Sequence, residues 1–334
     1  MTAILGDIPF LPERVSNLAA PVDAIFWGLT VISAFMTLGL FAVITFFLIR
    51  YRSTSNVDRT MSRISPTYLE VTWTTIPIIV FIGLFLWGAV VFASASKPPP
   101  DALQIYVVGQ QWYWSVRHEN GRHEIGDLHI PVGRPVQLIM TSADVIHDYF
   151  IPAFRSKRDV VPGKYTTEWF IATKAGKYRI FCNQYCGTKH GQMAGFVYAM
   201  RPGEYAAWLG AGNGSGQESV AQTGAGLFRR YSCSGCHGVN TGVHAPSLIG
   251  IYGRPVPLEG GGFAKVDEQY LRDSILKPSS QVVAGYKPIM PNYQGQMSEE
   301  DVMAIVAYIK SLSQPSASAA SASSATSQPI PNSP

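Results

Sequence analysis

The chain of 334 residues is poor in cysteine and in charged residues. Its four cysteines lie in two short motifs, at positions 182 and 186 and at positions 233 and 236, so none remains for a disulfide elsewhere. Two disulfides are the ordinary interpretation of four cysteines in an exported protein. Here, however, a histidine closely follows each pair, and a disulfide has no use for one. Charged residues make up 14% of the chain and the net charge is +4, so no nucleic-acid partner is expected.

Two long runs carry no charge at all, residues 24–49 and residues 71–96. Each exceeds the ~20 residues that a helix needs to cross a bilayer. They are too long for the core of a signal peptide, and no small-residue cleavage site follows the first, so it is expected to remain as an anchor. Pro77 in the second run is tolerated in a membrane helix. The sequence therefore predicts two transmembrane helices within residues 21–97, and two buried core helices are the weaker alternative.

The loop between these runs, about residues 50–65, sets the expected topology. It carries one acid, Asp58, against four arginines: Arg50, Arg52, Arg59 and Arg63. The positive-inside rule places such a loop in the cytoplasm. The N-terminal segment 1–20 and everything after Lys97 are then expected on the external or periplasmic side of a prokaryotic plasma membrane.

Glu70 stands at the cytoplasmic start of the second run. An acid there could simply complement the positive end of the helix dipole. Acids at a membrane boundary also mark proton paths. Both interpretations of Glu70 remain open at this point.

Residues 98–205 are expected to form a β domain. Short β-branched or aromatic runs are separated by Gly and Pro, a pattern typical of a sandwich or Greek-key barrel. The expected strands are residues 105–108, 135–140, 166–171, 178–181 and 196–198. The polar stretch 117–129 is expected to be a solvated hairpin.

Residues 182–193 form the motif that carries the clearest chemistry. It supplies two thiols, an imidazole and a thioether, from Cys182, Cys186, His190 and Met193. Sulfur with imidazole, and no oxygen ligand, is the set that copper prefers. Zinc also accepts Cys and His, but the methionine makes zinc the poorer choice.

The copper motif still lacks a ligand from elsewhere in the chain. His147 is the predicted one, because it follows a strand and can return to the same end of the sandwich. The rival histidines lie in the polar stretch 117–129: His118, His123 and His129.

The spacing C-x-x-x-C-x-x-x-H-x-x-M, the upstream His147, the run Gln-Trp-Tyr-Trp at 111–114 and the two preceding spans together resemble subunit II of haem–copper cytochrome c oxidases. The resemblance covers residues ~20 to 205. It implies a cupredoxin-like domain that holds the binuclear copper centre CuA. It also implies that Cys182 and Cys186 bridge the two ions. The implied terminal ligands are His147 and His190, and the weak axial ligands are Met193 and the main-chain oxygen of Gln184.

The same resemblance suggests roles for two more residues. Trp112 matches the residue at which electrons reach the copper centre, although its ring could equally be a packing group. Glu70 matches the acid at the mouth of a proton channel into subunit I. One position departs from the family, since Gln184 stands where Glu is usual. The carboxylate of that Glu binds magnesium in many relatives, whereas the copper contact uses only the main-chain oxygen.

A Gly- and Ser-rich stretch, residues 206–220, is expected to be a flexible linker to another domain. Beyond it, Cys233, Cys236 and His237 form the CxxCH motif of c-type haem attachment. The two thiols would anchor the haem and His237 would bind its iron. Met290 is the predicted opposite ligand, because it lies in an irregular Pro-rich loop. Met297 and Met303 are the alternatives.

Residues 221–313 resemble an all-α class I cytochrome c. A helix is expected to begin at Ser298 and to pack on another near residues 268–276. The resemblance implies that the carbonyl of Pro246 orients the His237 ring and that Arg254 meets a haem propionate. Residues 314–334, which lack charge and large apolar groups, are expected to be disordered.

The combination resembles the caa-type oxidases, in which a cytochrome c is fused to subunit II. It implies that electrons pass from an external donor, such as a cytochrome or an upstream respiratory complex, through haem c to CuA and on to the haem of subunit I, where dioxygen is reduced to water. The implied partners are subunit I, subunit III and membrane lipid. Neither span contains a histidine, so the dioxygen site is expected on another chain. A CuA-containing nitric-oxide reductase subunit and a membrane-anchored carrier without a catalytic partner are the alternatives.

Overall fold

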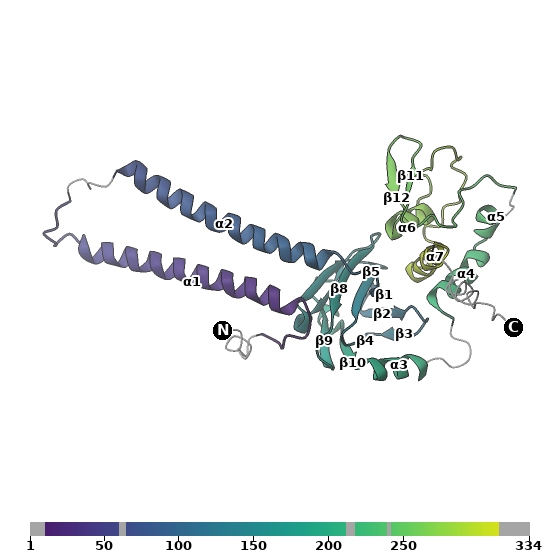
Figure 1. Cartoon of the computed structure of the whole chain (residues 1–334), viewed down its shortest axis with the longest axis horizontal. Helices are drawn as coiled ribbons and strands as arrows, with labels where there is room; N and C mark the ends of the chain where they lie inside the picture. The colour runs from purple at the N-terminus through teal and green to yellow at the C-terminus, as the bar shows by residue number, and fades with distance from the viewer. Residues whose placement is uncertain (1–10, 60–64, 212–217, 239–241, 314–334) are drawn as a thin grey trace, which may run out of the picture.

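The computed structural model describes residues 11–59, 65–211, 218–238 and 242–313. A long helical hairpin leads into a two-sheet β domain, and a small helical domain lies on the far side of that β domain (Figure 1). The predicted tail, residues 314–334, lies outside the described residues.

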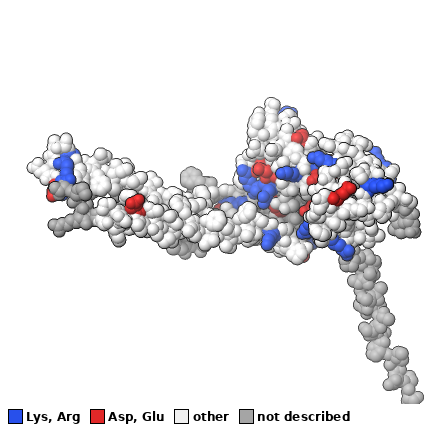
Figure 2. Space-filling view, turned by 90° about the horizontal axis from the view of Figure 1, so that it is seen from above, with Lys and Arg blue, Asp and Glu red and all other residues white. Residues whose placement is uncertain are grey.

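The hairpin consists of α1 (Ala19–Arg50) and α2 (Pro66–Ser96). The most apolar 18-residue windows of these helices have mean hydropathies of 2.4 and 2.6, and no part of either window is buried. Charged side chains gather on the globular part and at the far tip of the hairpin, while the hairpin between them is almost uncharged (Figure 2). A helix that is apolar all round requires an apolar environment, so this geometry suits a membrane-spanning hairpin.

A buried carboxylate joins the hairpin to the β domain. Asp23, in the first turns of α1, is 3% exposed. Its two oxygens lie 2.7 Å from Nε of Arg14 and 2.7 Å from Nε of Arg155. The Arg155 guanidinium also donates to the carbonyls of Pro12 and Pro152. This network holds the base of α1 against the β domain.

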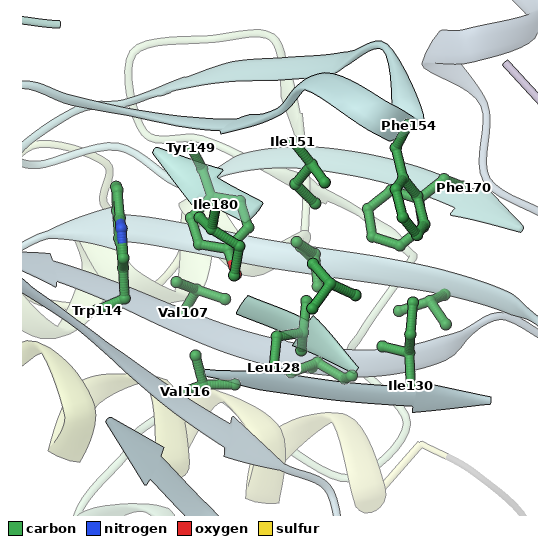
Figure 3. Packing of buried hydrophobic residues seen from close by; sticks show 14 of the residues in the cluster. Val107, Trp114, Val116, Leu128, Ile130, Tyr149, Ile151, Phe154, Phe170 and Ile180 are labelled. Atoms are coloured by element: carbon green, nitrogen blue, oxygen red, sulfur yellow. The ribbon is translucent and has the colours of Figure 1, made fainter. Parts of the chain in front are cut away.

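The β domain is a sandwich of two five-stranded sheets. One has the strand order β3-β2-β1-β5-β8 and the other β4-β10-β9-β6-β7. A single apolar core fills the space between them, with Trp114, Tyr149, Phe154 and Phe170 among its largest members (Figure 3). The strands are β1 (Leu103–Gln110), β2 (Tyr113–His118), β3 (His123–Ile125), β4 (Leu128–Pro131), β5 (Pro135–Ser142), β6 (His147–Ile151), β7 (Ser156–Val160), β8 (Thr166–Ile171), β9 (Gly176–Cys182) and β10 (Ala194–Met200).

The prediction of a solvated hairpin at 117–129 is wrong. These residues contribute to β2, β3 and β4, and His118 is only 1% exposed. The rings of His118 and His129 contact the two oxygens of Glu124 at 2.7 and 2.5 Å. A polar stretch can be buried when its own members satisfy one another, and its sequence alone does not reveal that.

The predicted linker 206–220 begins inside a helix, α3 (Pro202–Ala211). Trp208 holds this helix on the β domain, because its ring stacks on His129 at 4.3 Å and lies under the Arg122 guanidinium at 3.7 Å. Residues 212–217 lie outside the described part of the chain. The next helix is capped by Ser219, whose side chain accepts a hydrogen bond from the Gln222 backbone.

The C-terminal domain is helical apart from a short hairpin. Ser298 caps the last helix, as predicted, by accepting a hydrogen bond from the backbone of Asp301. The elements are α4 (Val220–Arg230), α5 (Ser234–His237), β11 (Pro255–Pro257), β12 (Phe263–Lys265), α6 (Glu268–Leu276) and α7 (Glu299–Ser311).

This helical domain is docked on the β domain. An apolar cluster crosses the boundary between them, with Tyr106, Val108 and Ile139 on one side and Val220, Met303, Ala304 and Ala307 on the other. Polar contacts surround the cluster. Arg272 donates to the carbonyl of Gly163 at 3.0 Å, and the Lys310 ammonium donates to the side chain of Gln104 at 2.9 Å. The two domains therefore form a packed interface with both apolar and polar contacts.

Glu168 is an unusual member of the sandwich core. It is 6% exposed on β8, and its Oε2 accepts a hydrogen bond from Ser156 at 2.5 Å. Among the described residues, Oε1 has no hydrogen-bond partner. Burial raises the pKa of Glu168 to about 8, so the folded protein keeps this carboxyl protonated at neutral pH.

We expect Glu168→Gln to stabilise the protein, and to do so more at pH 9 than at pH 4. Between pH 4.5 and about 8 the unfolded chain releases the Glu168 proton while the folded chain retains it, so stability falls as the pH rises through this window. The stabilisation by Glu168→Gln should be larger at pH 9 than at pH 4 by a few kcal/mol, which is on the order of the pKa shift converted to free energy. Thermal unfolding at a series of pH values measures it, with exposed Glu218→Gln as the control. A gain that does not vary with pH would contradict this assignment.

Candidate metal and haem sites

The copper motif is the connection between two paired strands. β9 and β10 run antiparallel, with Phe181 opposite Ala194. The Cys182 amide donates to the carbonyl of Met193 at 3.0 Å, so the ladder closes both ends of the loop. Between them, a short 3-10 turn at His190–Gln192 folds the middle of the loop back. The sheet thus brings the first and last donors of the motif together.

All six predicted ligands converge at this loop. The two thiol sulfurs of Cys182 and Cys186 are 3.7 Å apart. The Cys182 sulfur lies 3.9 Å from Nδ1 of His147 and 3.3 Å from the carbonyl oxygen of Gln184. The Cys186 sulfur lies 3.5 Å from Nδ1 of His190 and 3.8 Å from the sulfur of Met193. Each thiol therefore has its own imidazole and its own weak donor.

The electrostatics of this pair suit a bound cation. Burial opposes ionisation of both thiols, yet hydrogen bonds from His147 and the backbone hold the pKa of Cys182 below its usual range. Burial and the adjacent Cys182 raise the pKa of Cys186. Two buried thiols this close do not both ionise without positive charge between them. Because the donors are sulfur and imidazole, they fit copper.

Asp144 orients the distant ligand, and we did not predict it. Its Oδ1 lies 2.8 Å from Nε2 of His147, which leaves Nδ1 to face the two thiols. Backbone amides of Gln111 and Val145 donate to the same carboxylate at 2.7 and 2.6 Å. An acid that fixes the outer nitrogen of a metal-binding histidine is a common arrangement. An Asp three residues before that histidine was the signal available in the sequence.

Trp112 packs directly on the copper loop. Its indole nitrogen donates to the carbonyl of Cys186 at 3.2 Å, and the Gln111 side chain donates to the same oxygen at 2.8 Å. Gly187 makes this contact possible. Its φ is +116°, and a Cβ there would meet Gln111 at 3.0 Å and Trp112 at 3.3 Å. Trp114, in contrast, is fully buried and packs edge-on against Tyr149.

The rival histidines lie apart from the copper loop. His118 and His129 share the carboxylate of Glu124, and His123 contacts Ser115 at 3.0 Å. Burial alone would raise the pKa of Glu124, but hydrogen bonds from the two imidazoles hold it at about 2. The contacts of these three histidines with Glu124 and Ser115 join β2, β3 and β4.

The C-terminal domain contains an apolar cavity of about 360 Å³. Side chains of α4, α6 and α7 form one wall, and the irregular loops around residues 243–248 and 281–291 form the other. Of the predicted haem residues, five line the cavity: Cys233, Cys236, His237, Pro246 and Met290. The His237 Nδ1 lies 2.9 Å from the Pro246 carbonyl oxygen, so Nε2 is left for an iron. An apolar slot with two thiols beside an oriented imidazole fits a covalent haem.

Among the described residues that line this cavity, Met290 is the only methionine. Met303 is 3% exposed and belongs to the cluster between the domains. Met297 packs at the edge of the helical core. Arg254, the predicted propionate partner, is exposed beside Gly250 and outside the cavity lining. The structure thus places Met290, but not Arg254, at the haem cavity.

Glu70 lies in the first turns of α2, at the end of the hairpin farthest from the β domain (Figure 1). It is exposed in this chain. It is therefore far from both redox sites, and its proton-path role remains a prediction.

The fold and the two sites define a membrane-anchored protein that carries a copper-binding β domain and a cytochrome domain. The family profile for cytochrome c oxidase subunit II, periplasmic domain, matches residues 123–200. The family profile for cytochrome c matches residues 221–313.

Three known proteins are similar to this chain to different extents. Cytochrome c oxidase subunit 2 of Alkalihalophilus pseudofirmus is 31% identical over 84% of this chain and 84% of its own length. The alternative cytochrome c oxidase subunit 2 of Bradyrhizobium diazoefficiens is 32% identical over 36% of this chain and 55% of its own length. The crystal structure of the periplasmic domain of subunit II from Bradyrhizobium japonicum is 28% identical, with a TM-score of 0.33 over 34% of this chain and 96% of that one.

The chain belongs to the cytochrome c oxidase subunit II family and carries a fused cytochrome c domain. It is a subunit of a haem–copper oxidase, an oxidoreductase. The predicted family, fold class and membrane anchor are confirmed.

We expect Gly109→Ala to weaken copper retention. A Cβ at Gly109 would lie 3.0 Å from the His147 ring and 3.0 Å from the Trp114 ring. Overpacking of this kind costs about 1–3 kcal/mol. A displacement of the His147 ring would relieve it and would move a copper ligand. Copper content after dialysis against a chelator measures the effect. Gly203→Ala, whose Cβ would meet nothing within 4 Å, is the control, and equal copper retention in both variants would contradict the prediction.

Proposed function

We propose that this chain is the electron-input subunit of a respiratory terminal oxidase that reduces dioxygen to water. Electrons would pass from an external donor to haem c, then to a binuclear CuA centre, and on to the haem of subunit I. One observation carries the proposal. A single chain places a two-thiol, two-imidazole, one-thioether cluster and a CxxCH haem cavity in two domains docked on one another.

The arrangement of donors favours two metal ions over one. His147 and the Gln184 carbonyl lie beside the Cys182 sulfur, while His190 and Met193 lie beside the Cys186 sulfur. The two sulfurs lie between these groups, where each can serve both ions. A copper pair held by these residues would supply a one-electron carrier. A mononuclear copper site needs one thiol, so the second cysteine is the discriminating residue.

The residues around the cluster limit its reorganisation. Cys182, Cys186, Met193 and His147 are at most 8% exposed, so water is excluded from most of the site. The β9–β10 ladder holds the loop ends, Asp144 holds the His147 ring, and Trp112 with Gln111 holds the Cys186 carbonyl. Ligands fixed by such a shell keep their geometry during electron transfer. The contact of Trp112 with the Cys186 carbonyl supports it as a residue through which electrons reach the site.

The docked haem domain supports direct transfer within the chain. Helix α7 lies between the two sites, since Ile305 and Ile309 line the haem cavity while Met303 packs towards β1. On β1, Gly109 lies against the His147 ring. Methionine opposite His237 would give the haem a raised potential. A tether with a built interface keeps the donor at a high effective concentration.

The anchor supports a partner in the membrane. A hairpin exposed on all sides needs lipid or other subunits, and subunit I, subunit III and lipid would cover it. In this arrangement the hairpin crosses the membrane twice, and both termini and both globular domains face the periplasm or the external side. Glu70 then lies at the cytoplasmic face, where it would admit protons to a channel of subunit I.

The alternatives differ in the catalytic partner. Purified with its native partners, the complex should consume dioxygen rather than nitric oxide, and a large haem-containing subunit should co-purify with this chain. Recovery of this chain alone in detergent would favour a free-standing carrier.

In the natively expressed complex we expect about one acid-stable haem per chain and about two copper atoms per chain in addition to the copper of the haem–copper partner subunit. Cys186→Ser should lose the two copper atoms of this chain and keep the haem, because the two sites lie in separate domains. In this variant an external donor should still reduce the haem, while oxygen uptake should fall at least about a hundredfold, as loss of an obligatory carrier requires. Metal analysis, haem spectra and oxygen uptake provide the readouts. One copper atom or none beyond that of the partner subunit in the parent complex would rule out the binuclear site.

We expect Met303→Lys to slow electron transfer from haem to copper. A buried ammonium in the apolar cluster with Tyr106 and Val108 separates the domains, because it lacks a partner there. Time-resolved absorbance after rapid reduction of the haem measures the rate. Met303→Leu, which retains the apolar contact, should behave like the parent. A transfer rate that Met303→Lys leaves unchanged would show that this interface is not on the route.

A further inference from the structure

The lining of the haem cavity includes an aromatic pair that the proposed function does not use. The rings of His244 and Tyr286 stack face to face, with centroids 4.6 Å apart and planes 16° apart. Both residues line the cavity. They come from different loops, and each loop carries one side of the haem site.

The first loop supports the His237 side. Pro246, whose carbonyl accepts from the His237 ring at 2.9 Å, lies two residues after His244. The second loop carries Met290, four residues after Tyr286. The stack therefore connects the segment that orients one axial ligand to the segment that presents the other.

The Met290 loop is anchored near both of its ends by contacts of a different kind. At its start, the Ala284 amide donates to the carbonyl of Pro257, and the Glu259 amide donates to the carbonyl of Val282, both at 2.9 Å. Beyond Met290, the Tyr293 hydroxyl donates to the carbonyl of Tyr231 at 3.0 Å. Tyr286 lies between these anchors, and it follows Gly285 at φ +85°.

We propose that His244 and Tyr286 form a clasp that holds the Met290 thioether at the haem iron. The pair acts as positioning residues, through the loop rather than by touching the iron. A thioether is a weak ligand, so its occupancy depends on how firmly its loop is held. An aromatic pair at this spacing supplies the kind of stabilisation that a short surface loop otherwise lacks. The proposal rests on the assignment of Met290 as the axial ligand.

The test uses the full complex and added imidazole, which competes with Met290 for ferric haem. In the parent, the weak red charge-transfer band of methionine-ligated ferric haem reports the Met290 bond. At fixed pH, His244→Ala and Tyr286→Ala should each bind imidazole roughly two- to tenfold more tightly than the parent, the change expected for loss of one aromatic pair. The double variant should be no tighter than either single one, because the same contact is lost.

Matched variants separate the clasp from a general loosening of the domain. His244→Phe keeps a flat ring and should restore the imidazole affinity of the parent. If an alanine variant does not retain haem, His244→Leu and Tyr286→Leu, which are apolar but not aromatic, enter the same comparison. An alanine or leucine variant that binds imidazole with the affinity of the parent would overturn the proposal. A His244→Phe variant that binds imidazole as tightly as His244→Ala would overturn it too. A parent complex without the methionine band would instead refute Met290 as the ligand, so the two failures are distinguishable.

Discussion

Two thiol sulfurs held 3.7 Å apart inside a protein are the constraint on which the rest of this structure depends. Neighbouring buried thiols resist joint ionisation, so a site that holds them together is suited to a shared cation. The β9–β10 ladder, the Asp144–His147 contact and the Trp112 packing all fix groups around this pair. The sandwich core beneath them, with its large buried aromatic residues, gives the loop a stiff base.

Helix α7 and strand β1 each pack against two different parts of the molecule, one on each face. On α7, Ile305 faces the haem cavity and Met303 faces the copper domain. On β1, Tyr106 and Val108 face the haem domain, while Val107 belongs to the sandwich core. Helix α7 therefore contacts both the haem cavity and the copper domain, and β1 contacts both the haem domain and the sandwich core. Such packing favours a fixed donor–acceptor geometry over a swinging tether.

The spacing motifs allowed a definite prediction because their chemistry is local. A CxxCH segment brings its thiols and imidazole to one side of a short turn, and the copper loop brings four of its donors together within twelve residues. The apolar spans and the capped last helix were predictable for the same reason. The polar stretch 117–129 was not, because its burial depends on the contacts of Glu124 with two imidazoles from other strands. The linker was also misjudged, since α3 is stabilised by Trp208 packing on residues far away in the chain.

The sequence by itself determined which chemical groups this protein contains: the predicted copper donors, the CxxCH motif, the methionine loop and the two apolar spans. These features follow from residue type and short spacing, which do not change with the fold. Only the tertiary structure decided that Asp144 orients His147, that Glu168 is buried in the sandwich core, that the haem domain docks on β1, and that His244 meets Tyr286. Each of these depends on contacts between segments distant in sequence, and such contacts arise only when the chain packs into layers with few internal gaps.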